Sequence, residues 1–411
     1  MLADRLNRPS GIAGQATLPI VNSISANSSI AGQCLFLING LGMGNSTRCH
    51  AIMEQLVERG VRVDVLTSGN GLAYFANRPE AASLIPTRGF HYSSRNGHVS
   101  GFRTAASLLD HYRIGRQKQD DLEALLTRLP VDVIVTDSEY STSPARKMGI
   151  PLIGLNNADL VVAEYLRKVR TPPGIHSHFW LVEYSDYLFH RFRCDAVISP
   201  SPQAGTSRHP RINRVGLIVR RAVRTIAPQE RTAFPEPRNI RSVVFMLSGS
   251  TFASAVDFGD GKLPFRVDVV GREGSNRGNV VFHGRLMDNI HLLQQADALV
   301  INGGFSAVSE AIALNKPTFV IPVSGHAEQY VNARLVSDLG LGYVVTAENV
   351  MEKLLQLYKV NQWDGLAARA PITGIDGASE AANIICERIR QQRHARLQHS
   401  PQYHPGNDHL R

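Results

Sequence analysis

Two adjacent glycines and a serine stand where a predicted strand turns into a predicted helix. The apolar run at 296–301 predicts a buried parallel strand, Asn302, Gly303 and Gly304 predict a turn, and helical periodicity begins near Ser306. Glycine lets the backbone approach a ligand closely, and the N–H groups and positive dipole end of a helix N-terminus attract anions, most often phosphate. These residues therefore predict a phosphate-binding turn.

Three polar side chains lie on the elements that follow this turn. Glu310 falls one turn into the same predicted helix, where its carboxylate would reach the hydroxyls of a ribose. The apolar run at 317–323 predicts the next strand, and Glu328 and Gln329 follow its C-terminal end. Ligands of open α/β sheets bind beyond the carboxyl ends of the strands, so these groups are expected to share one crevice with the phosphate.

A second glycine-rich turn, GLGMGNSTR at 40–48, lies between a predicted strand at 34–40 and a predicted helix at 46–59. Its spacing does not fit the GxGxxG pattern of dinucleotide-binding turns. Asn45 cannot accept a proton at neutral pH, so it either orients a ligand or caps the helix. Arg48 either contacts a phosphate or an acceptor, or pairs with a nearby carboxylate.

Two carboxylates follow a third predicted strand at 131–137. Asp137 ends this strand and Glu139 comes two residues later, so both face the crevice of the 40–48 turn if the sheet is parallel. Asp137 is the preferred candidate for a catalytic base or for the group that orients an acceptor hydroxyl, and Glu139 is the second candidate. The alternative is structural, because an acidic residue at a strand end often caps the next helix.

The predicted strands and helices that carry these residues alternate along the chain, which predicts an α/β fold of two Rossmann-like domains. A chain of 411 residues with 43% hydrophobic residues can bury two such cores. The segment 251–264 lacks helical periodicity where a crossover helix is expected. We expect a loosely ordered arm at 1–30, an N-terminal domain at 31–215, an Arg-rich linker at 216–241, a C-terminal domain at 242–375, and a terminal helix with a basic tail at 376–411.

The composition argues against several classes of protein. The four cysteines are far apart and form no CxxC pattern, so neither a zinc site nor a disulfide framework is expected, and a reducing cytoplasm is the simplest compartment. We expect neither a membrane-spanning helix nor a signal peptide, because no apolar run is long enough. Nine arginines lie within 208–241, which indicates either a solvated linker or a surface for anionic membrane. Nucleic acid is not an expected partner, since no aromatic residues alternate with these arginines.

The order of these residues resembles a known family, the GT-B glycosyltransferases that use nucleotide-sugars, including UDP-glycosyltransferases and the peptidoglycan N-acetylglucosaminyltransferase. The loop at 40–48 is similar to the GxGxGHxxR pattern of one subgroup, with Asn45 in place of the histidine. TDSEY…KMGIP at 136–151 is similar to an acidic motif of the same subgroup. The donor-binding half of the family is matched by Gly303-Gly304, Ser306, Glu310, Lys316-Pro317, Pro322, Glu328-Gln329 and Asn332-Ala333.

The resemblance implies a role for each matched position. The acceptor-side loop would contribute Gly42, Gly44, Asn45 and Arg48. Glu310 would bind the ribose, Glu328 and Gln329 would bind the sugar hydroxyls, and the backbone near Arg285 and Leu286 would contact the base. The residues that would contact the donor diphosphate are Ser248, Ser250, Gly303, Gly304, Ser306 and Ala307. No metal ligand and no cofactor are implied, because no DxD-type carboxylate pair lies near the donor site.

By this resemblance we expect a metal-independent, inverting glycosyltransferase that moves a hexosyl group from a nucleotide-diphosphate sugar, preferably a UDP-sugar, to an acceptor hydroxyl. The acceptor would be lipid-linked, a polysaccharide or a small molecule, in cell-envelope or secondary-metabolite glycosylation. The expected location is the cytoplasm, with peripheral association at the inner face of the membrane as an option. Two alternatives stay open, namely a sugar-nucleotide epimerase of the same fold and a catalytically weak sugar-nucleotide-binding or partner protein.

Overall fold

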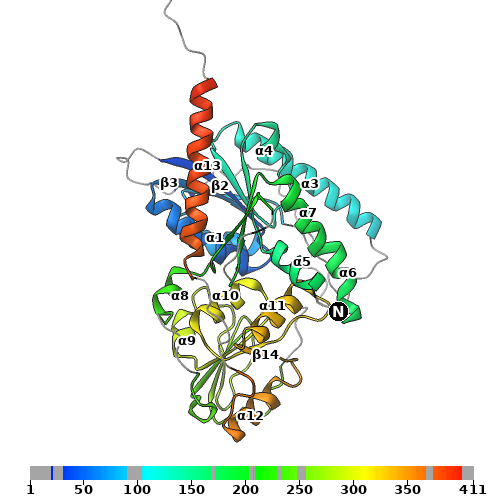
Figure 1. The fold of residues 1–411 in the computed structure, drawn as a ribbon, viewed down its shortest axis with the longest axis vertical. Coiled ribbons are helices and arrows are strands. Elements are labelled where there is room, and N and C mark those ends of the chain that lie inside the picture. Colours follow the sequence, from blue (N-terminus) through cyan, green and yellow to red (C-terminus); the bar gives the residue numbers. More distant parts are fainter. Residues whose placement is uncertain are drawn as a thin grey trace, which may run out of the picture.

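The chain folds into two lobes, each built around one sheet, with the N-terminal lobe above the C-terminal lobe in Figure 1. The part of the chain that this computed structural model describes comprises residues 20–21, 31–89, 104–167, 172–202, 207, 209–228, 234–247, 256–366 and 374–399. Within it the N-terminal sheet has 8 strands and the C-terminal sheet has 6. The predicted fold class, two Rossmann-like α/β domains, is confirmed.

The N-terminal sheet is parallel apart from its edge pair, in which β1 and β4 are antiparallel. Its central strand pairs with both neighbours so that Ile38 lies beside Thr67 on one side and Asp137 on the other. The turns that follow these strands therefore lie at one edge of the sheet. The spatial order is β1 (Ile20–Val21), β4 (Ser83–Pro86), β3 (Val61–Thr67), β2 (Gly32–Ile38), β5 (Val133–Asp137), β6 (Leu152–Leu155), β7 (Ala196–Pro200) and β8 (Ile212–Val215).

The C-terminal sheet is parallel throughout its named strands. Met246 lies beside both Val270 and Ile301, so three strands end level with one another. The described residues 256–265 before β10 contain turns and no helix, in agreement with their lack of helical periodicity. The spatial order is β11 (Val280–Phe282), β10 (Arg266–Val270), β9 (Ser242–Met246), β12 (Ala298–Ile301), β13 (Thr318–Val320) and β14 (Gly342–Val344).

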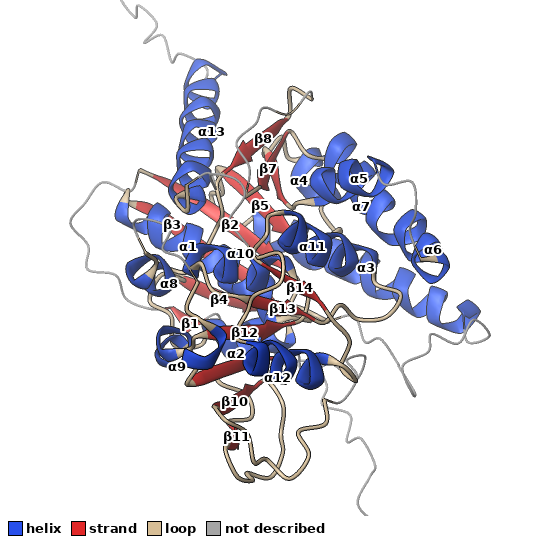
Figure 2. Cartoon of the chain, turned by 60° about the horizontal axis from the view of Figure 1, so that its bottom comes forward, coloured by secondary structure: helices blue, strands red, loops and turns tan. Residues whose placement is uncertain are grey.

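Helices cover the sheets, as Figure 2 shows. The N-terminal lobe contains α1 (Met43–Glu58), α2 (Gly69–Phe75), α3 (Thr104–Leu126), α4 (Ser143–Lys147), α5 (Ala158–Arg167), a 3-10 turn (Pro173–Ile175), α6 (His176–His178), a π-helical turn (Phe179–Glu183) and α7 (Tyr184–Arg193). The remaining helices are α8 (Arg221–Ile226), a 3-10 turn (Pro237–Asn239), α9 (Ile290–Gln295), α10 (Phe305–Leu314), α11 (Ala327–Asp338), α12 (Val350–Val360) and α13 (Gly377–His399). None of the described helices has the length and apolar composition needed to cross a bilayer.

Each sheet has an apolar core on both faces, because successive side chains of a strand point to opposite sides. In β2, Phe36 packs into one N-terminal core while Leu35 and Leu37 pack into the other. In β12, Leu299 and Val300 divide in the same way between the two C-terminal cores. Burial on both faces explains why the central strands are apolar runs and not alternating ones.

Two chain segments connect the lobes, and they lie side by side. The first leaves β8 at Gly216, and the second returns at 374–377 into α13, which packs on α1 and β2 of the N-terminal lobe (Figure 1). Leu217 N–H donates to Gly374 O at 3.1 Å, and Gly377 N–H donates to Leu217 O at 3.2 Å. A Cβ on Gly216 would stand 2.2 Å from Gly374 O, so this close backbone contact requires glycine.

Candidate active site

A cavity of about 1010 Å³ lies between the two lobes. It opens at the carboxyl ends of strands from both sheets, where open α/β sheets bind ligands. Residues directly after β2, β5, β6, β9, β10 and β12 line it, namely Asn39, Ser138, Asn156, Leu247, Gly271 and Asn302. The predicted site residues that line it are Gly42, Gly44, Asn45, Arg48, Leu286, Gly304, Ser306, Ala307, Glu328 and Gln329.

Helix α10 begins at the wall of this cavity. Gly304 is the N-cap residue of this helix and makes no side-chain cap. A Cβ added to Gly304 would have no neighbouring atom within 4 Å. Ser306 and Ala307, in the first turn, also line the cavity. The first N–H groups of a helix have no partner within the helix, so this end is suited to a phosphate. Ser248 and Ser250, the other predicted phosphate contacts, lie outside the described residues.

Glu328 and Gln329 form the wall beside the turn before α10. Asn332 Nδ2 donates to Gly303 O at 2.9 Å, which ties α11 to this turn. Gly303 lies behind the wall and not on it, and a Cβ there would stand 2.5 Å from Gln329 O, so glycine serves close packing at this position. Burial raises the pKa of Glu328 above its usual value.

Apolar side chains form part of the donor side of the cavity, at the ends of β9 and β10. Met246, Val270 and Leu286 line it, and Arg285 lines the cavity with its side chain exposed. An apolar slot of this kind suits the flat face of a nucleobase. The predicted position of the base, near Arg285 and Leu286, is therefore part of the cavity wall.

Glu310 is not among the residues that line the cavity. Its carboxylate receives two hydrogen bonds from Arg220, 2.6 Å from Nε to Oε1 and 2.9 Å from Nη2 to Oε2. Burial alone would lower the pKa of Arg220, but Glu310 raises it, so this is a buried ion pair. In this structure the carboxylate is held by the segment that joins the lobes, and the ribose-binding role of Glu310 stays a prediction.

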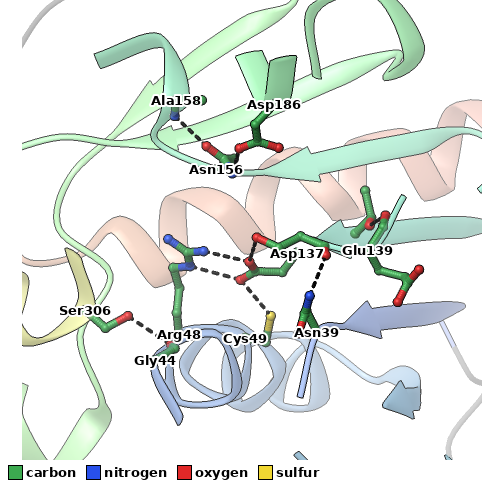
Figure 3. A network of polar contacts seen from close by, with 12 residues as sticks. Asn39, Gly44, Arg48, Cys49, Asp137, Glu139, Asn156, Ala158, Asp186 and Ser306 are labelled. Atoms are coloured by element: carbon green, nitrogen blue, oxygen red, sulfur yellow. Dashed lines mark hydrogen bonds and ion pairs between the residues drawn. The ribbon is translucent and has the colours of Figure 1, made fainter. Parts of the chain in front are cut away.

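On the acceptor side, α1 begins at Met43, three residues earlier than the sequence predicts, with Gly42 as its N-cap. Asn45 therefore lies inside the first turn and does not cap the helix, although it lines the cavity. Gly44 O accepts a hydrogen bond from Ser306 Oγ at 2.9 Å. This contact joins the two glycine-rich turns across the cleft (Figure 3).

Asp137 lies behind the cavity wall and is fully buried. Arg48 donates to both of its oxygens, at 3.0 Å from Nε and 2.7 Å from Nη2, and Cys49 Sγ lies 3.4 Å from Oδ2 (Figure 3). Both carboxylate oxygens are thereby occupied. Asp137 does not line the cavity but fixes the cavity-lining Arg48, and its roles as base or as orienter of the acceptor hydroxyl stay predictions.

Glu139, the second predicted catalytic residue, is also buried and does not line the cavity. It pairs with the buried Lys118, and its Oε1 accepts a hydrogen bond from Ser141 N–H at 3.2 Å. These bonds hold the loop after β5. Like Asp137, Glu139 lies behind the cavity wall in this structure, and its catalytic role stays a prediction.

A carboxylate that the sequence did not single out, Asp186 on α7, does line the cavity. It accepts hydrogen bonds from Tyr140 Oη at 2.8 Å and Asn156 Nδ2 at 2.7 Å, and His190 Nδ1 lies 3.1 Å from Oδ1. Burial would raise the pKa of Asp186, but His190 lowers it below its usual range. Asp186 is therefore ionised at neutral pH.

Three further groups on the wall, His178, Glu183 and His326, place their nitrogen and oxygen atoms within 4.8 Å of one another. Glu183 ends the π-helical turn, a local distortion that often occurs at functional sites. Burial, with Glu328 and Asp186 adding to it, raises the pKa of Glu183 to about 9. A second set of such groups, His50, Glu54 and Glu80, lies around α1.

Comparison with known proteins places this geometry in a family. The model of glycosyl transferase family 1 matches residues 32–178 and 211–360, which is more than half of the chain. The UDP-N-acetylglucosamine–N-acetylmuramyl-(pentapeptide) pyrophosphoryl-undecaprenol N-acetylglucosamine transferase of Bacillus cytotoxicus is 23% identical over 342 residues, covering 75% of this chain and 87% of that relative.

Two shorter matches are somewhat more identical. The transferase of the same name from Shouchella clausii is 29% identical over 105 residues, which cover 25% of this chain and 30% of that relative. An uncharacterized UDP-glucosyltransferase of Bacillus subtilis, YojK, is 30% identical over 110 residues, covering 25% and 27%. The chain thus matches less than a third of the length of these two curated relatives.

Solved structures share the two-lobed fold over most of the chain. Arabidopsis thaliana UGT89C1 complexed with UDP has a TM-score of 0.53 at 15% identity, covering 86% of this chain and 100% of that one. LpCGTa in complex with UDP has a TM-score of 0.54 at 17% identity, covering 87% and 99%. With the family model matched in both lobes and the GT-B fold observed, the chain belongs to glycosyl transferase family 1 and is a glycosyltransferase.

Proposed function

We propose that this enzyme transfers a hexosyl group from a UDP-sugar to a hydroxyl group of a separate acceptor, with inversion at the anomeric carbon. One observation carries the proposal: α10 opens without a side-chain cap into the cavity between the lobes, beside Glu328 and Gln329. The diphosphate would bind the first N–H groups of α10, and the sugar would then lie against Glu328 and Gln329. The UDP complexes among the structural relatives support this donor class.

In this proposal the diphosphate needs no divalent ion of its own. The helix N-terminus supplies positive potential, and Arg285 and Arg48 line the same cavity. Donors fixed before the reaction stabilise the charge that develops on the leaving group without the cost of reorienting water. The uracil ring would lie against the apolar side chains of Leu286, Met246 and Val270.

The reaction joins the acceptor oxygen to the anomeric carbon while the bond from that carbon to the diphosphate oxygen breaks, and the bonding pair leaves with UDP. The hydroxyl proton must pass to a base, and Asp186 is the ionised carboxylate on the acceptor wall. Asp137 would act through Arg48, which it holds in place, and Glu139 through the loop after β5. We assign Asp186 the proton-accepting role and Asp137 and Glu139 positioning roles.

We assign the acceptor to the lipid-linked class, held at an anionic membrane surface. Trp180, Leu181 and Val182 expose 50%, 76% and 49% of their area on the π-helical turn, and Val182 also lines the cavity. Exposed apolar groups of this size mark contact surfaces. The relative from Bacillus cytotoxicus, which is named for a pyrophosphoryl-undecaprenol acceptor, supports this assignment.

Incubation of the purified chain with ¹³C-labelled UDP-sugars, with and without undecaprenyl-linked acceptors, distinguishes the candidate functions by NMR. Transfer predicts release of UDP that depends on the acceptor. A UDP-sugar epimerase would instead convert the labelled sugar to its epimer without an acceptor, and a binding protein would broaden the donor signals without turnover. Either of those two results would refute transfer, as would a donor signal that the protein leaves unchanged.

A further inference from the structure

Three side chains with metal-ligating atoms meet at the junction of the two lobes. His178 ends α6 and Glu183 ends the π-helical turn in the N-terminal lobe, while His326 is the N-cap residue of α11 in the C-terminal lobe. Nδ1 of His178 lies 3.4 Å from Oε1 of Glu183, and Nδ1 of His326 lies 4.0 Å from the same oxygen. The two imidazole rings lie 4.5 Å apart between centroids.

We infer that His178, Glu183 and His326 bind one divalent transition-metal ion of the Zn²⁺ class, which links the two lobes at the cavity. Two imidazoles and one carboxylate are a ligand set that Zn²⁺ takes in open, water-accessible sites. A tetrahedral ion with bonds of about 2.1 Å holds its ligand atoms about 3.4 Å apart. The His178–Glu183 distance of 3.4 Å fits this geometry, and the His326–Glu183 distance of 4.0 Å has to shorten by about 0.6 Å.

The hydrogen bonding of the two histidines leaves them available as ligands. Nδ1 of His326 is buried and has no hydrogen-bond partner among the described residues. Nδ1 of His178 accepts one long bond, 3.4 Å from Ala327 N–H, which an ion would replace.

The partners of Glu183 also leave its carboxyl group accessible to a cation. Within the described residues, Glu183 pairs with the two histidines and with no lysine or arginine. Glu328 and Asp186 are the nearby carboxyl groups that act on it. A divalent ion bound here would displace no lysine or arginine from Glu183.

All three ligands line the cavity, so the fourth coordination position would face the space between the lobes, where water or a substrate oxygen can enter. The ion would also bridge the π-helical turn to the start of α11 and favour the closed cleft. This site goes beyond the proposed function, which assigns no metal to the diphosphate. It also revises the sequence-based expectation that the chain has no metal ligands.

The experiment titrates Zn²⁺ into the full chain after treatment with a chelator. Bound metal is counted by mass spectrometry, and its affinity is measured by competition with a chromophoric chelator. We expect one equivalent of bound zinc. His178→Ala, Glu183→Gln and His326→Ala should each weaken binding by about 100-fold or more, since even the loss of a residue that only orients a metal ligand costs 10–100-fold. Co²⁺ added in place of Zn²⁺ should give visible absorption bands that these variants lose.

Two control variants locate the ion. His291→Ala removes an exposed histidine, and His50→Gln removes the histidine of the cluster with Glu54 and Glu80. Both variants should still bind one equivalent of zinc. Circular dichroism and UDP affinity establish that each variant is folded. Zinc bound equally by wild type and His326→Ala, or no binding above that of an unrelated protein of equal histidine count, would overturn the inference. UDP binding by the metal-free chain tests the proposed function separately.

Discussion

Arg220 and Glu310 join the segment between the lobes to the helix that opens into the cavity, through a pair whose side chains are only 14% and 8% exposed. This pair uses both carboxylate oxygens of a residue that the sequence assigns to ribose binding. The consequence is that α10 is held by the protein itself before any ligand arrives. Its N-terminus is therefore pre-organised for a diphosphate.

Replacing Glu310 tests this relationship. Glu310→Ala leaves a buried guanidinium without a partner, which should lower the free energy of unfolding by about 3–5 kcal/mol, measured by urea denaturation. UDP affinity, measured by calorimetry on the folded variant, should change little because Glu310 does not line the cavity. Glu352→Ala, an exposed glutamate on α12, is the control and should cost little. A weaker UDP affinity with unchanged stability would show that Glu310 binds the ribose of the donor.

The N-terminus of α10 can be tested with one added charge. Ala307→Glu places a carboxylate in the first turn, where it suits the helix dipole but repels a diphosphate. We expect UDP affinity to fall by about 10-fold or more, since like charges about 4 Å apart near a surface cost several kcal/mol. Ala307→Gln has the same size without the charge and should retain most of the affinity. Equal losses in both variants would show that bulk, and not charge, is responsible.

Removing the proposed base should affect turnover more than binding. Asp186→Asn keeps the hydrogen bonds to Tyr140 and Asn156 within reach, so kcat should fall by about 10²–10⁴ while UDP affinity stays near that of the wild type. Asp137→Asn should behave differently, because it leaves the buried Arg48 unpaired and destabilises the fold. If Asp137→Asn abolishes turnover without a loss of stability, Asp137 is the base and Asp186 has the positioning role.

The His190–Asp186 pair should make stability depend on pH in both directions. Burial would lower the pKa of His190, but Asp186 raises it. The contribution of His190 to the free energy of unfolding is therefore complete below about pH 6.5, and it is lost as the pH rises through the pKa of His190 in the folded state. The pKa of Asp186 is lowered, so the contribution of Asp186 to the free energy of unfolding is lost only in acid, below about pH 4. The difference in Tm between wild type and His190→Gln should therefore shrink from pH 6 to pH 9. A constant difference would argue against a charged pair.

The exposed apolar turn should determine membrane binding. Leu181→Glu adds a negative charge to a side chain that is 76% exposed, and it should reduce sedimentation with vesicles that contain phosphatidylglycerol. Leu397→Glu alters a leucine on α13 that is 74% exposed, and it should bind as the wild type does. Neither variant should change UDP affinity. Equal loss of binding in both variants would assign the membrane contact to net charge alone.

The parts of the site that follow strands could be predicted from the sequence. Apolar runs mark buried parallel strands, and polar or glycine residues directly after them must lie at the ligand-binding edge, as Gly304 and Ser306 do. The same rule could have found Asn39, Asn156 and Asn302, which also follow apolar strands and line the cavity. The fold class followed from this pattern because the central strands are buried on both faces.

The parts that depend on distant pairing could not be read from the sequence. Glu310 and Arg220 are 90 residues apart, and Asp137 and Arg48 are 89 apart, so only the folded chain shows that each carboxylate is already occupied. Asp186 lies on an amphipathic helix where an acid is usually solvated, and its histidine partner one turn later gave no distinct signal. The start of α1 at Met43 was missed because helical periodicity becomes visible only at Ser46.

The paired crossing at Gly216 and Gly377 limits how the two lobes can separate. Because both covalent tethers pass through one hydrogen-bonded strip, the lobes can swing about that strip, whereas sliding or twisting would break its bonds. Substrate entry and product exit then both depend on one motion, the change in angle between the two lobes. A bulky side chain at either glycine would change the resting angle, and with it the rate of every step that requires the enzyme to open.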